Sequence, residues 1–219
     1  MNTLIIGAMK IEVEALCAEF SAIEKEKGVF VSENGDDTVI ICQCGIGKVN
    51  AAALTQRIID KYSPDRIINT GTAGGLQDGL NIGDVIIAAK AAYHDFKPVS
   101  IVVDMFGDKY IHSDKSLVET ASEACEKYGI PHRIGTVVTG DCFVSTKEQR
   151  DDIFAEYPDA ICTEMEGAAI AHVCNINQIP FVIIRAISDF AADEKLFDEF
   201  AAHAAKFAAQ ISGYIARKD

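Results

Sequence analysis

Residues 181–189 read FVIIRAISD, a nearly continuous apolar run that ends at Asp189. A short apolar run rich in β-branched residues predicts a strand buried on both faces. Two other apolar runs are also followed by a carboxylate: residues 3–7 by Glu12, and residues 160–162 by Glu166. Because ligands of open α/β sheets bind just beyond the carboxyl ends of such strands, we expect the three carboxyl groups to face one pocket.

The chemistry that fits neighbouring carboxyl groups is proton transfer. The sequence shows no metal-ligand pattern and no activated nucleophile beside them. Carboxyl groups alone serve as general acid, as general base and as stabiliser of a cationic transition state, which is the set needed to break a glycosidic bond. The pattern therefore favours cleavage of a glycosidic bond without a metal ion.

These charged residues also have structural interpretations. A glutamate in the first turn of a helix, such as Glu12, commonly interacts with the helix dipole, and an aspartate such as Asp189 after a serine is typical of a cap. Glu164 and Glu166 would point about 200° apart on a helix, so we expect one of them to be solvated. Arg185 lies inside an apolar strand, so we expect it to have a carboxylate or a ligand as partner.

Length and composition bound the class of protein. A chain of 219 residues that is 49% hydrophobic is enough for one large core, so we expect residues 1–219 to form a single α/β domain. The formal net charge of -13 disfavours nucleic acid or an anionic membrane as a partner, because both repel an acidic protein. A small neutral or zwitterionic ligand fits this charge better.

The seven cysteines are odd in number, lie mostly in apolar runs and include no C-x-x-C pair, which is typical of reduced core residues. Cys42 and Cys44 would share one face of a strand, but no histidine or second cysteine pair completes a metal site. The chain opens directly into an apolar strand without a signal-like segment, and no apolar run approaches membrane-spanning length. We therefore expect a cytoplasmic protein.

Strand-like and helix-like patterns alternate along the chain. Strands are predicted at residues 3–6, 38–44, 66–69, 85–89, 134–139, 160–162 and 181–187. Helices are predicted at residues 11–20, 49–61, 114–128, 167–175 and 198–216, and a capping box at residues 145–148 predicts another helix that runs towards Ala155. This order predicts an α/β sandwich with a mixed, mostly parallel sheet.

Two glycine clusters follow predicted strands. The cluster GTAGG at residues 71–75 either brings bare backbone close to a ligand or forms an ordinary tight turn. The cluster GIGK at residues 45–48 lacks the third glycine of a dinucleotide fingerprint and the Ser or Thr that follows the lysine of a P-loop. Because neither nucleotide-cofactor motif is present, we expect no cofactor.

Seven sequence blocks occur in the order found in one enzyme family. They are IIGAM at residues 5–9 with Glu12, GIGKV at 45–49, NTGTAGG at 69–75, YHD at 93–95, TGD at 139–141 with Phe143, EMEGAA at 164–169 and RAISD at 185–189. The chain thus resembles, over nearly its whole length, the 5′-methylthioadenosine/S-adenosylhomocysteine nucleosidases of the nucleoside phosphorylase superfamily.

That resemblance implies a fold, an assembly and an activity. The implied fold is a three-layer α/β/α sandwich whose central mixed sheet curls into a partial barrel, and the implied assembly is a homodimer. The implied reaction is hydrolysis of the N-glycosidic bond of 5′-methylthioadenosine or S-adenosylhomocysteine, with 5′-deoxyadenosine as a further candidate, in methionine salvage and nucleoside catabolism. The products are adenine and the ribosyl sugar.

The resemblance also implies a role for each matching residue. Asp189, held by Ser188, resembles the acid that protonates N7 of the leaving adenine, since desolvation disfavours the charged form of a buried aspartate. Glu12 resembles the base that activates water, and Glu166 the group that binds the ribose hydroxyls and stabilises the developing positive charge. The other substrate-binding positions that the resemblance implies are Ala73, Gly74, Phe143, Val144, Glu164, Met165, Arg185 and Phe197.

Two other functions remain open from the sequence. Phosphorylases of this superfamily carry an arginine where this chain has Asn69, and Glu12 would repel phosphate, so hydrolysis is favoured, although Lys10 and Lys48 are each long enough to reach an anion. A protein that only bound adenine nucleosides would gain little from burying three acids.

The chain departs from the family's pattern between Asp95 and Ser113. Residues 96–110 read FKPVSIVVDMFGDKY, where typical members carry a Gly/Gln/Pro-rich loop that reaches into the partner subunit's 5′ pocket. The preferred 5′ substituent is therefore not defined by the sequence. Because this segment is too apolar to lie exposed, we expect it to pack against a second subunit and to place Met105 or Phe106 near the 5′ group.

Overall fold

The computed structural model describes the backbone of residues 1–190 and 194–218, and the side chains of residues 1–190 and 200–218. Its strands are β1 (Asn2–Gly7), β2 (Ile23–Glu26), β3 (Val29–Asn34), β4 (Asp37–Gln43), β5 (Arg66–Gly75), β6 (Val85–Tyr93), β7 (Ile111–His112), β8 (His132–Thr139), β9 (Ala160–Glu164) and β10 (Phe181–Asp189). Its helices are α1 (Lys10–Phe20), α2 (Lys48–Tyr62), α3 (Val99–Phe106), α4 (Lys115–Tyr128), α5 (Lys147–Glu156), α6 (Gly167–Asn177) and α7 (Glu194–Ala216).

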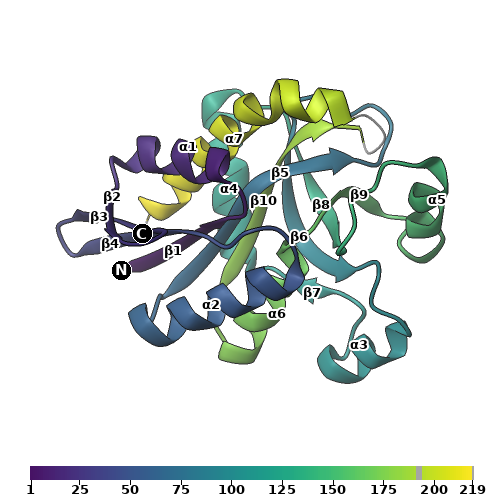
Figure 1. Ribbon diagram of the computed structural model, residues 1–219, viewed down its shortest axis with the longest axis horizontal. Helices are drawn as coiled ribbons and strands as arrows, with labels where there is room; N and C mark the ends of the chain where they lie inside the picture. Colours follow the sequence, from purple (N-terminus) through teal and green to yellow (C-terminus); the bar gives the residue numbers. More distant parts are fainter. Residues whose placement is uncertain (191–193, 219) are drawn as a thin grey trace.

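The sheet is partly a closed ring and partly an open arm. Strand β5 pairs with β10, which leads through β6, β8 and β9 back to β5. From β5 the sheet also extends outward through β1, β4, β3 and β2 (Figure 1). The ring brings strands that are distant in sequence to a common end, and this arrangement positions the functional site.

Helices cover both faces of the sheet, which makes three layers (Figure 1). Helices α1, α4 and α7 lie on one face, and α2 and α6 lie on the other (Figure 1). The alternation of a strand sends Leu4 and Ile6 into the core beneath α2 and α6, and Ile5 into the core beneath α1 and α7. This two-sided burial explains why β1 reads as an uninterrupted apolar run.

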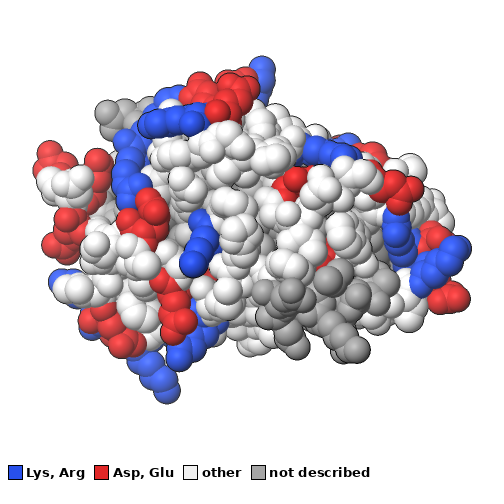
Figure 2. Space-filling view, turned by 90° about the horizontal axis from the view of Figure 1, so that it is seen from above, with Lys and Arg blue, Asp and Glu red and all other residues white. Residues whose placement is uncertain are grey.

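The molecular surface over α1, α4 and α7 carries charges of both signs (Figure 2). Figure 2 shows Lys and Arg side chains lying among Asp and Glu side chains on this face, with uncharged surface between them. Within the described residues, no helix is both long enough and apolar enough to cross a membrane.

The predicted fold class is confirmed, with corrections in detail. Among the described strands, five pairings are parallel and five are antiparallel, so the expectation of a mostly parallel sheet was wrong. The hairpin β2–β3 accounts for part of the difference. The four residues of β2 are exposed at the edge of the sheet and show no apolar alternation. The hairpin therefore could not be predicted from the sequence pattern.

Two local predictions also need correction. The capping box of α5 is formed by Thr146 and Gln149, one residue later than predicted, because Thr146 is the residue whose side chain accepts the helical N–H of Gln149. The glycine cluster at residues 71–75 is the second half of the long strand β5. The tight-turn interpretation was therefore wrong, because residues 71–74 pair with β10 and residues 74–75 pair with β9. The other interpretation, that the cluster brings backbone close to a ligand, stays a prediction.

Candidate active site

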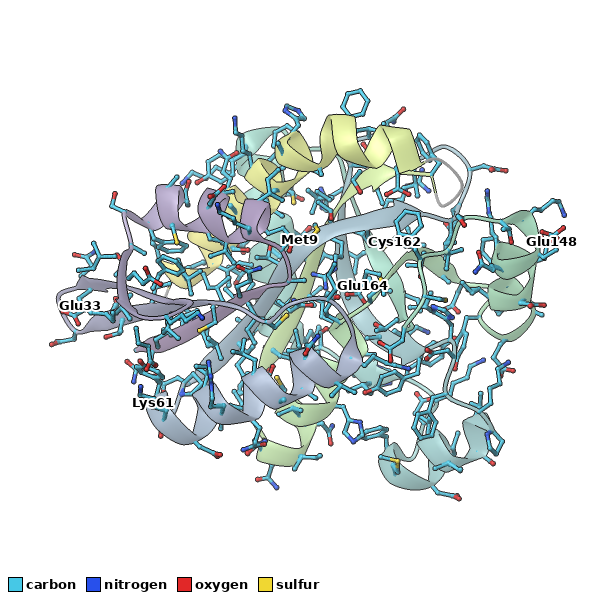
Figure 3. All side chains as sticks on the ribbon, viewed as in Figure 1. Met9, Glu33, Lys61, Glu148, Cys162 and Glu164 are labelled. Carbon is cyan, nitrogen blue, oxygen red and sulfur yellow. The ribbon has the colours of Figure 1, made fainter. Side chains whose placement is uncertain are left out.

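The C-terminal residues of β5, β9 and β10 meet beside the start of α1. Asp189 of β10 is paired with Gly74 of β5, and Gly74 is paired with Thr163 of β9. Next to them is a pocket of about 190 Å³. Its described lining consists of Ala8, Met9, Glu12, Ile46, Thr72, Ala73, Gly74, Cys142, Phe143, Val144, Thr163, Glu164, Met165, Glu166, Ser188 and Asp189. Met9 and Glu164, labelled in Figure 3, mark its place near the centre of the molecule.

Glu12 is fixed from two sides by backbone donors. It is the third residue of α1, and its Oε2 accepts the N–H groups of Ala8 at 2.8 Å and Met9 at 3.0 Å, which caps the helix. Its Oε1 accepts the N–H of Thr72 at 3.0 Å. A Cβ on Gly71 would lie 2.5 Å from that Oε1, so glycine is required for the carboxylate to reach β5. The side chain both caps the helix and lines the pocket.

Glu166, the residue directly before α6, is also buried. Its Oε1 accepts the N–H of Gly47 at 2.8 Å, a residue 119 positions earlier in the chain. Burial raises the pKa of Glu166, the nearby charge of Glu164 raises it further, and the hydrogen bond from Gly47 opposes both. This carboxyl group therefore gains and loses its proton at a higher pH than an exposed glutamate.

Glu164, at the end of β9, is the anionic half of a buried ion pair. Its Oε2 accepts a hydrogen bond from Arg185 Nη2 and the N–H of Gly167 at 2.7 Å, and its Oε1 accepts the hydroxyl of Thr139. Arg185 Nη2 also donates to Asn69. Both side chains of the ion pair are 2% exposed.

The expectation that Glu164 or Glu166 would be solvated was therefore wrong. The two residues are not on one helix: Glu164 ends a strand and Glu166 is the cap residue of α6, so the chain turns between them and both carboxyl groups face inward. The expectation of a carboxylate partner for Arg185 is confirmed.

Asp189, the last residue of β10, also lines the pocket. It is 2% exposed, and Ser188 Oγ donates to its Oδ2 at 2.9 Å. The carbonyl of Ala73 lies 3.4 Å from the same serine hydroxyl. Ser188 is thus placed to orient the Asp189 carboxyl group against β5.

Most of the predicted site residues come together in this pocket. Besides the three acids, Ala73, Gly74, Phe143, Val144, Glu164, Met165 and Ser188 line it. Arg185 lies behind Glu164 and is absent from the described lining. Phe197 lies outside the residues whose side chains the structure describes.

Met105 and Phe106 belong to α3 and are not part of the described lining of the pocket of this chain. Met105 is 48% exposed. The ring of Phe106 packs edge-on against His172 of α6, with ring centres 4.6 Å apart. Met105 is therefore the more exposed of the two, and their contribution to a partner's pocket stays a prediction.

Several lining residues were not predicted from the sequence. Four of them lie within the sequence blocks shared with the family, and those blocks could have identified them: Ala8, Met9, Ile46 and Thr72. Cys142 and Thr163 carried no signal, because small residues in apolar runs are commonest in cores.

The charge of the pocket wall is one-sided. The described lining contains four acidic side chains and no Lys, Arg or His. Lys10 Nζ lies 3.5 Å from Glu14 on the surface, and Lys48 Nζ is paired with Asp95 at 2.5 Å. The described part of the chain contains no group of three or more His, Cys, Asp or Glu that could hold a metal ion.

Comparison with known proteins places these features in a family. A model of the phosphorylase superfamily matches residues 2–217. A 5′-methylthioadenosine/S-adenosylhomocysteine nucleosidase of Staphylococcus aureus is 39% identical, covering 87% of each chain. The crystal structure of the nucleosidase of that name from Neisseria meningitidis, in complex with methylthio-immucillin-A, is 37% identical with a TM-score of 0.87 and covers 98% of this chain and 97% of its own.

A futalosine hydrolase from Helicobacter pylori has the same fold at greater sequence distance. It is 26% identical, with a TM-score of 0.90 over 98% of this chain and 97% of its own.

Proposed function

This chain belongs to the 5′-methylthioadenosine/S-adenosylhomocysteine nucleosidase family within the phosphorylase superfamily, and from that membership we propose that it hydrolyses 5′-substituted adenine nucleosides. The bond broken joins C1′ of the ribose to N9 of adenine, and the products are adenine and the ribosyl sugar. The substrates are 5′-methylthioadenosine and S-adenosylhomocysteine, with 5′-deoxyadenosine as a further candidate.

The acidic pocket wall is the observation that carries hydrolysis over phosphorolysis. A phosphorylase must hold an anion where its nucleophile attacks, and the described lining offers four acidic side chains and no basic one. Asn69, at the position where phosphorylases carry an arginine, is 2% exposed and donates to the carbonyl of Ile6 at 3.0 Å. Carboxylates repel phosphate and accept a proton from water, so water is the nucleophile that suits this site.

Each of the three acids then has a separate role in the reaction. Asp189 gives its proton to N7, so that adenine leaves as a neutral base while a ribosyl oxocarbenium ion forms. Glu166 binds the ribose hydroxyls and stabilises the positive charge on the sugar. Glu12, whose carboxylate is oriented by Ala8, Met9 and Thr72, removes a proton from the water that adds to C1′.

The pocket wall also offers a surface for the flat purine. Phe143 and Val144 follow β8 on the side of the pocket near the start of α5, and Ala73 and Gly74 present the backbone of β5. We assign Phe143 and Val144 to adenine, and Ala73, Gly74 and Met165 to the sugar. Glu164 and Arg185 support these residues from behind, and Phe197 completes the assignment as a residue closing over the pocket.

The wider setting of the protein is part of the same proposal. Residues 1–219 act as one nucleoside phosphorylase-like domain, and two copies form a homodimer in which Met105 or Phe106 of one subunit approaches the 5′ group bound by the other. The seven cysteines are free, which suits the reducing cytoplasm. There the enzyme would serve methionine salvage and nucleoside catabolism.

A product-release assay tests the function directly. The purified protein is incubated with 5′-methylthioadenosine, S-adenosylhomocysteine, 5′-deoxyadenosine, adenosine or inosine, each with and without phosphate and each with and without a chelator. We expect free adenine and free sugar from the 5′-substituted adenosines under every condition. Formation of a ribose 1-phosphate, or a rate that depends on phosphate, would overturn hydrolysis.

A further inference from the structure

Outside the pocket, three loops are tied together by one lysine. Lys48 is the first residue of α2 and directly follows the loop after β4. Its Nζ contacts Asp95 Oδ1, in the loop after β6, at 2.5 Å, and lies 3.7 Å from Asp141 Oδ2, in the loop after β8. The lysine chain also passes over the ring of Tyr93, with Nζ 5.6 Å from the ring centre.

Backbone hydrogen bonds close these contacts into a ring. Asp141 Oδ1 accepts the N–H of Lys48 at 2.8 Å, and Asp95 Oδ2 accepts the N–H of Asp141 at 2.8 Å. Each of the three residues is therefore bonded to both of the others. An isolated surface ion pair would contribute little, but a closed set of charge-assisted hydrogen bonds fixes the relative position of three loops.

The hydrogen-bonded ring of Lys48, Asp95 and Asp141 lies next to Gly47, whose N–H contacts Glu166. Gly47 immediately precedes Lys48, and its N–H is the donor to Glu166 Oε1 at 2.8 Å. Gly47 has a φ of 96°, and a Cβ at this position would lie 3.1 Å from Asp141 Oδ1. The residue therefore adopts a backbone conformation that suits glycine, pressed against one member of the ring.

We infer that Lys48, Asp95 and Asp141 are positioning residues that hold the N–H of Gly47 on Glu166 and thereby set the protonation and orientation of that carboxyl group during turnover. The three residues act through Gly47 and do not contact the reacting atoms. The inference rests on the proposed function of Glu166 in binding the ribose.

The other groups around Glu166 make this donor important. Glu164 from β9 and Glu12 from α1 both disfavour its ionised form, as burial does, while Arg185 from β10 favours it but is already bonded to Glu164. The Cys44 thiol is the remaining titratable neighbour, and burial raises its own pKa. Among the influences that lower the pKa of Glu166 and so favour its carboxylate, the hydrogen bond from Gly47 is the largest. Losing it should therefore raise the pKa of Glu166.

The test compares variants of the ring with a matched variant elsewhere on α2. Lys48→Met and Asp95→Asn break the ring, and Lys48→Arg keeps its charge. Lys61→Met is the control, because Lys61 is at the other end of the same helix and pairs with Glu26 on the surface. Adenine release from 5′-methylthioadenosine is measured from about pH 5 to about pH 9, with kcat and KM separated at each pH.

Breaking the ring should move the acidic limb of the kcat profile towards higher pH. We expect a shift of about one pH unit in Lys48→Met and Asp95→Asn, the size of one hydrogen bond to a charged group. Lys61→Met should keep the wild-type limb, and Lys48→Arg should recover part of the shift. In a Glu166→Gln background, Lys48→Met should cause no further shift.

A second readout separates this inference from the proposed function. The Glu166 carboxyl carbon can be titrated by NMR in protein labelled at glutamate, with its signal assigned from Glu166→Gln. Its pKa should rise in Lys48→Met whether or not the protein releases adenine. An unchanged Glu166 titration, or a lower kcat with an unmoved acidic limb, would overturn the positioning role. Absence of adenine release by the wild type would overturn the function alone.

Discussion

The carboxylate pocket and helix α3 differ in the burial of their side chains: the pocket buries charged groups, and α3 exposes apolar ones. Glu12, Glu166 and Asp189 are polar and at most 6% exposed, and each accepts a hydrogen bond from a neighbouring donor. In α3, Val102 is buried, whereas the apolar side chains of Ile101, Val103 and Met105 are 39–48% exposed. Buried charge is stable only where the fold supplies partners, and exposed apolar surface indicates a partner outside the chain. The difference marks the three carboxyl groups as supplied with partners by the fold, and α3 as an apolar surface that the fold leaves exposed.

The largest expected effect is on stability, at the floor of the pocket. Glu164→Gln removes the negative charge beside Arg185, whose guanidinium is buried and cannot be solvated. We expect the free energy of unfolding to fall by about 3 kcal/mol or more. Urea denaturation measures the change. Glu26→Gln, which breaks the surface pair with Lys61, is the control and should leave the midpoint near that of the wild type.

This expectation differs from the interpretation of the sequence in which Glu164 or Glu166 is solvated, because Glu164 is buried against Arg185. A midpoint for Glu164→Gln equal to that of Glu26→Gln would show that the buried pair does not hold the pocket together. It would also remove the contrast between a pocket with satisfied charges and an unsatisfied α3.

The next effect is on turnover. Glu12→Gln, Glu166→Gln and Asp189→Asn each remove a group that we propose acts in the transition state. We therefore expect kcat for adenine release to fall at least about a hundredfold, or about 3 kcal/mol in barrier height. Circular dichroism serves as the check that each variant is folded. Near-normal rates for Asp189→Asn on adenine nucleosides would contradict its assignment to the leaving group.

A smaller effect concerns stability against pH. Burial and then Glu164 raise the pKa of Glu166 from 4.5 to about 8, so the folded protein favours the protonated form. The resulting stabilisation is fully present below about pH 4.5 and is lost as the pH rises through about 8. Glu166→Gln cannot ionise, so its stability relative to the wild type should increase as the pH rises between these values.

Thermal or urea unfolding of both proteins at several pH values gives this difference. A stability difference between Glu166→Gln and the wild type that stays constant with pH would mean that Glu166 is not the protonated group. Burial and the neighbouring carboxylates would then disfavour the ionised form of Glu166 less than its position in the pocket indicates.

The smallest effect belongs to α3. Met105→Ala should change the ratio of kcat/KM for 5′-methylthioadenosine over S-adenosylhomocysteine by less than about tenfold, because it alters one apolar contact with the 5′ group. Phe106→Ala should act similarly and also loosen α3 from His172. Ile23→Ala, at an exposed apolar position on β2, is the control and should leave the ratio unchanged.

Light scattering on the same variants tests the subunit contact. We expect the wild type to be a homodimer, and Met105→Ala to weaken the dimer or leave it intact while still shifting the substrate ratio. A fully active monomer, or variants that lose activity equally on every 5′ group, would contradict a role for α3 in a partner's pocket.

Much of the fold could be predicted from local sequence. Most predicted strands and helices lie within observed elements, because uninterrupted apolar runs and helical periodicity follow directly from two-sided and one-sided burial. The edge hairpin β2–β3 and the helix α3 could not be predicted in this way. The strand β2 is entirely exposed, and α3 presents apolar side chains on its exposed as well as its buried surface, so neither has a one-faced pattern.

By itself, the sequence singled out Glu12, Glu166 and Asp189 as candidate residues, and all three line one pocket beyond the strand ends. Only the tertiary structure decided that Glu164 is buried against Arg185, and that Gly47 donates to Glu166 across 119 residues. The physical reason is that hydrogen-bonding and ion-pair partners are set by which loops the closed ring of strands brings together. A linear pattern records the period of burial along one element, but not the identity of the group that faces it.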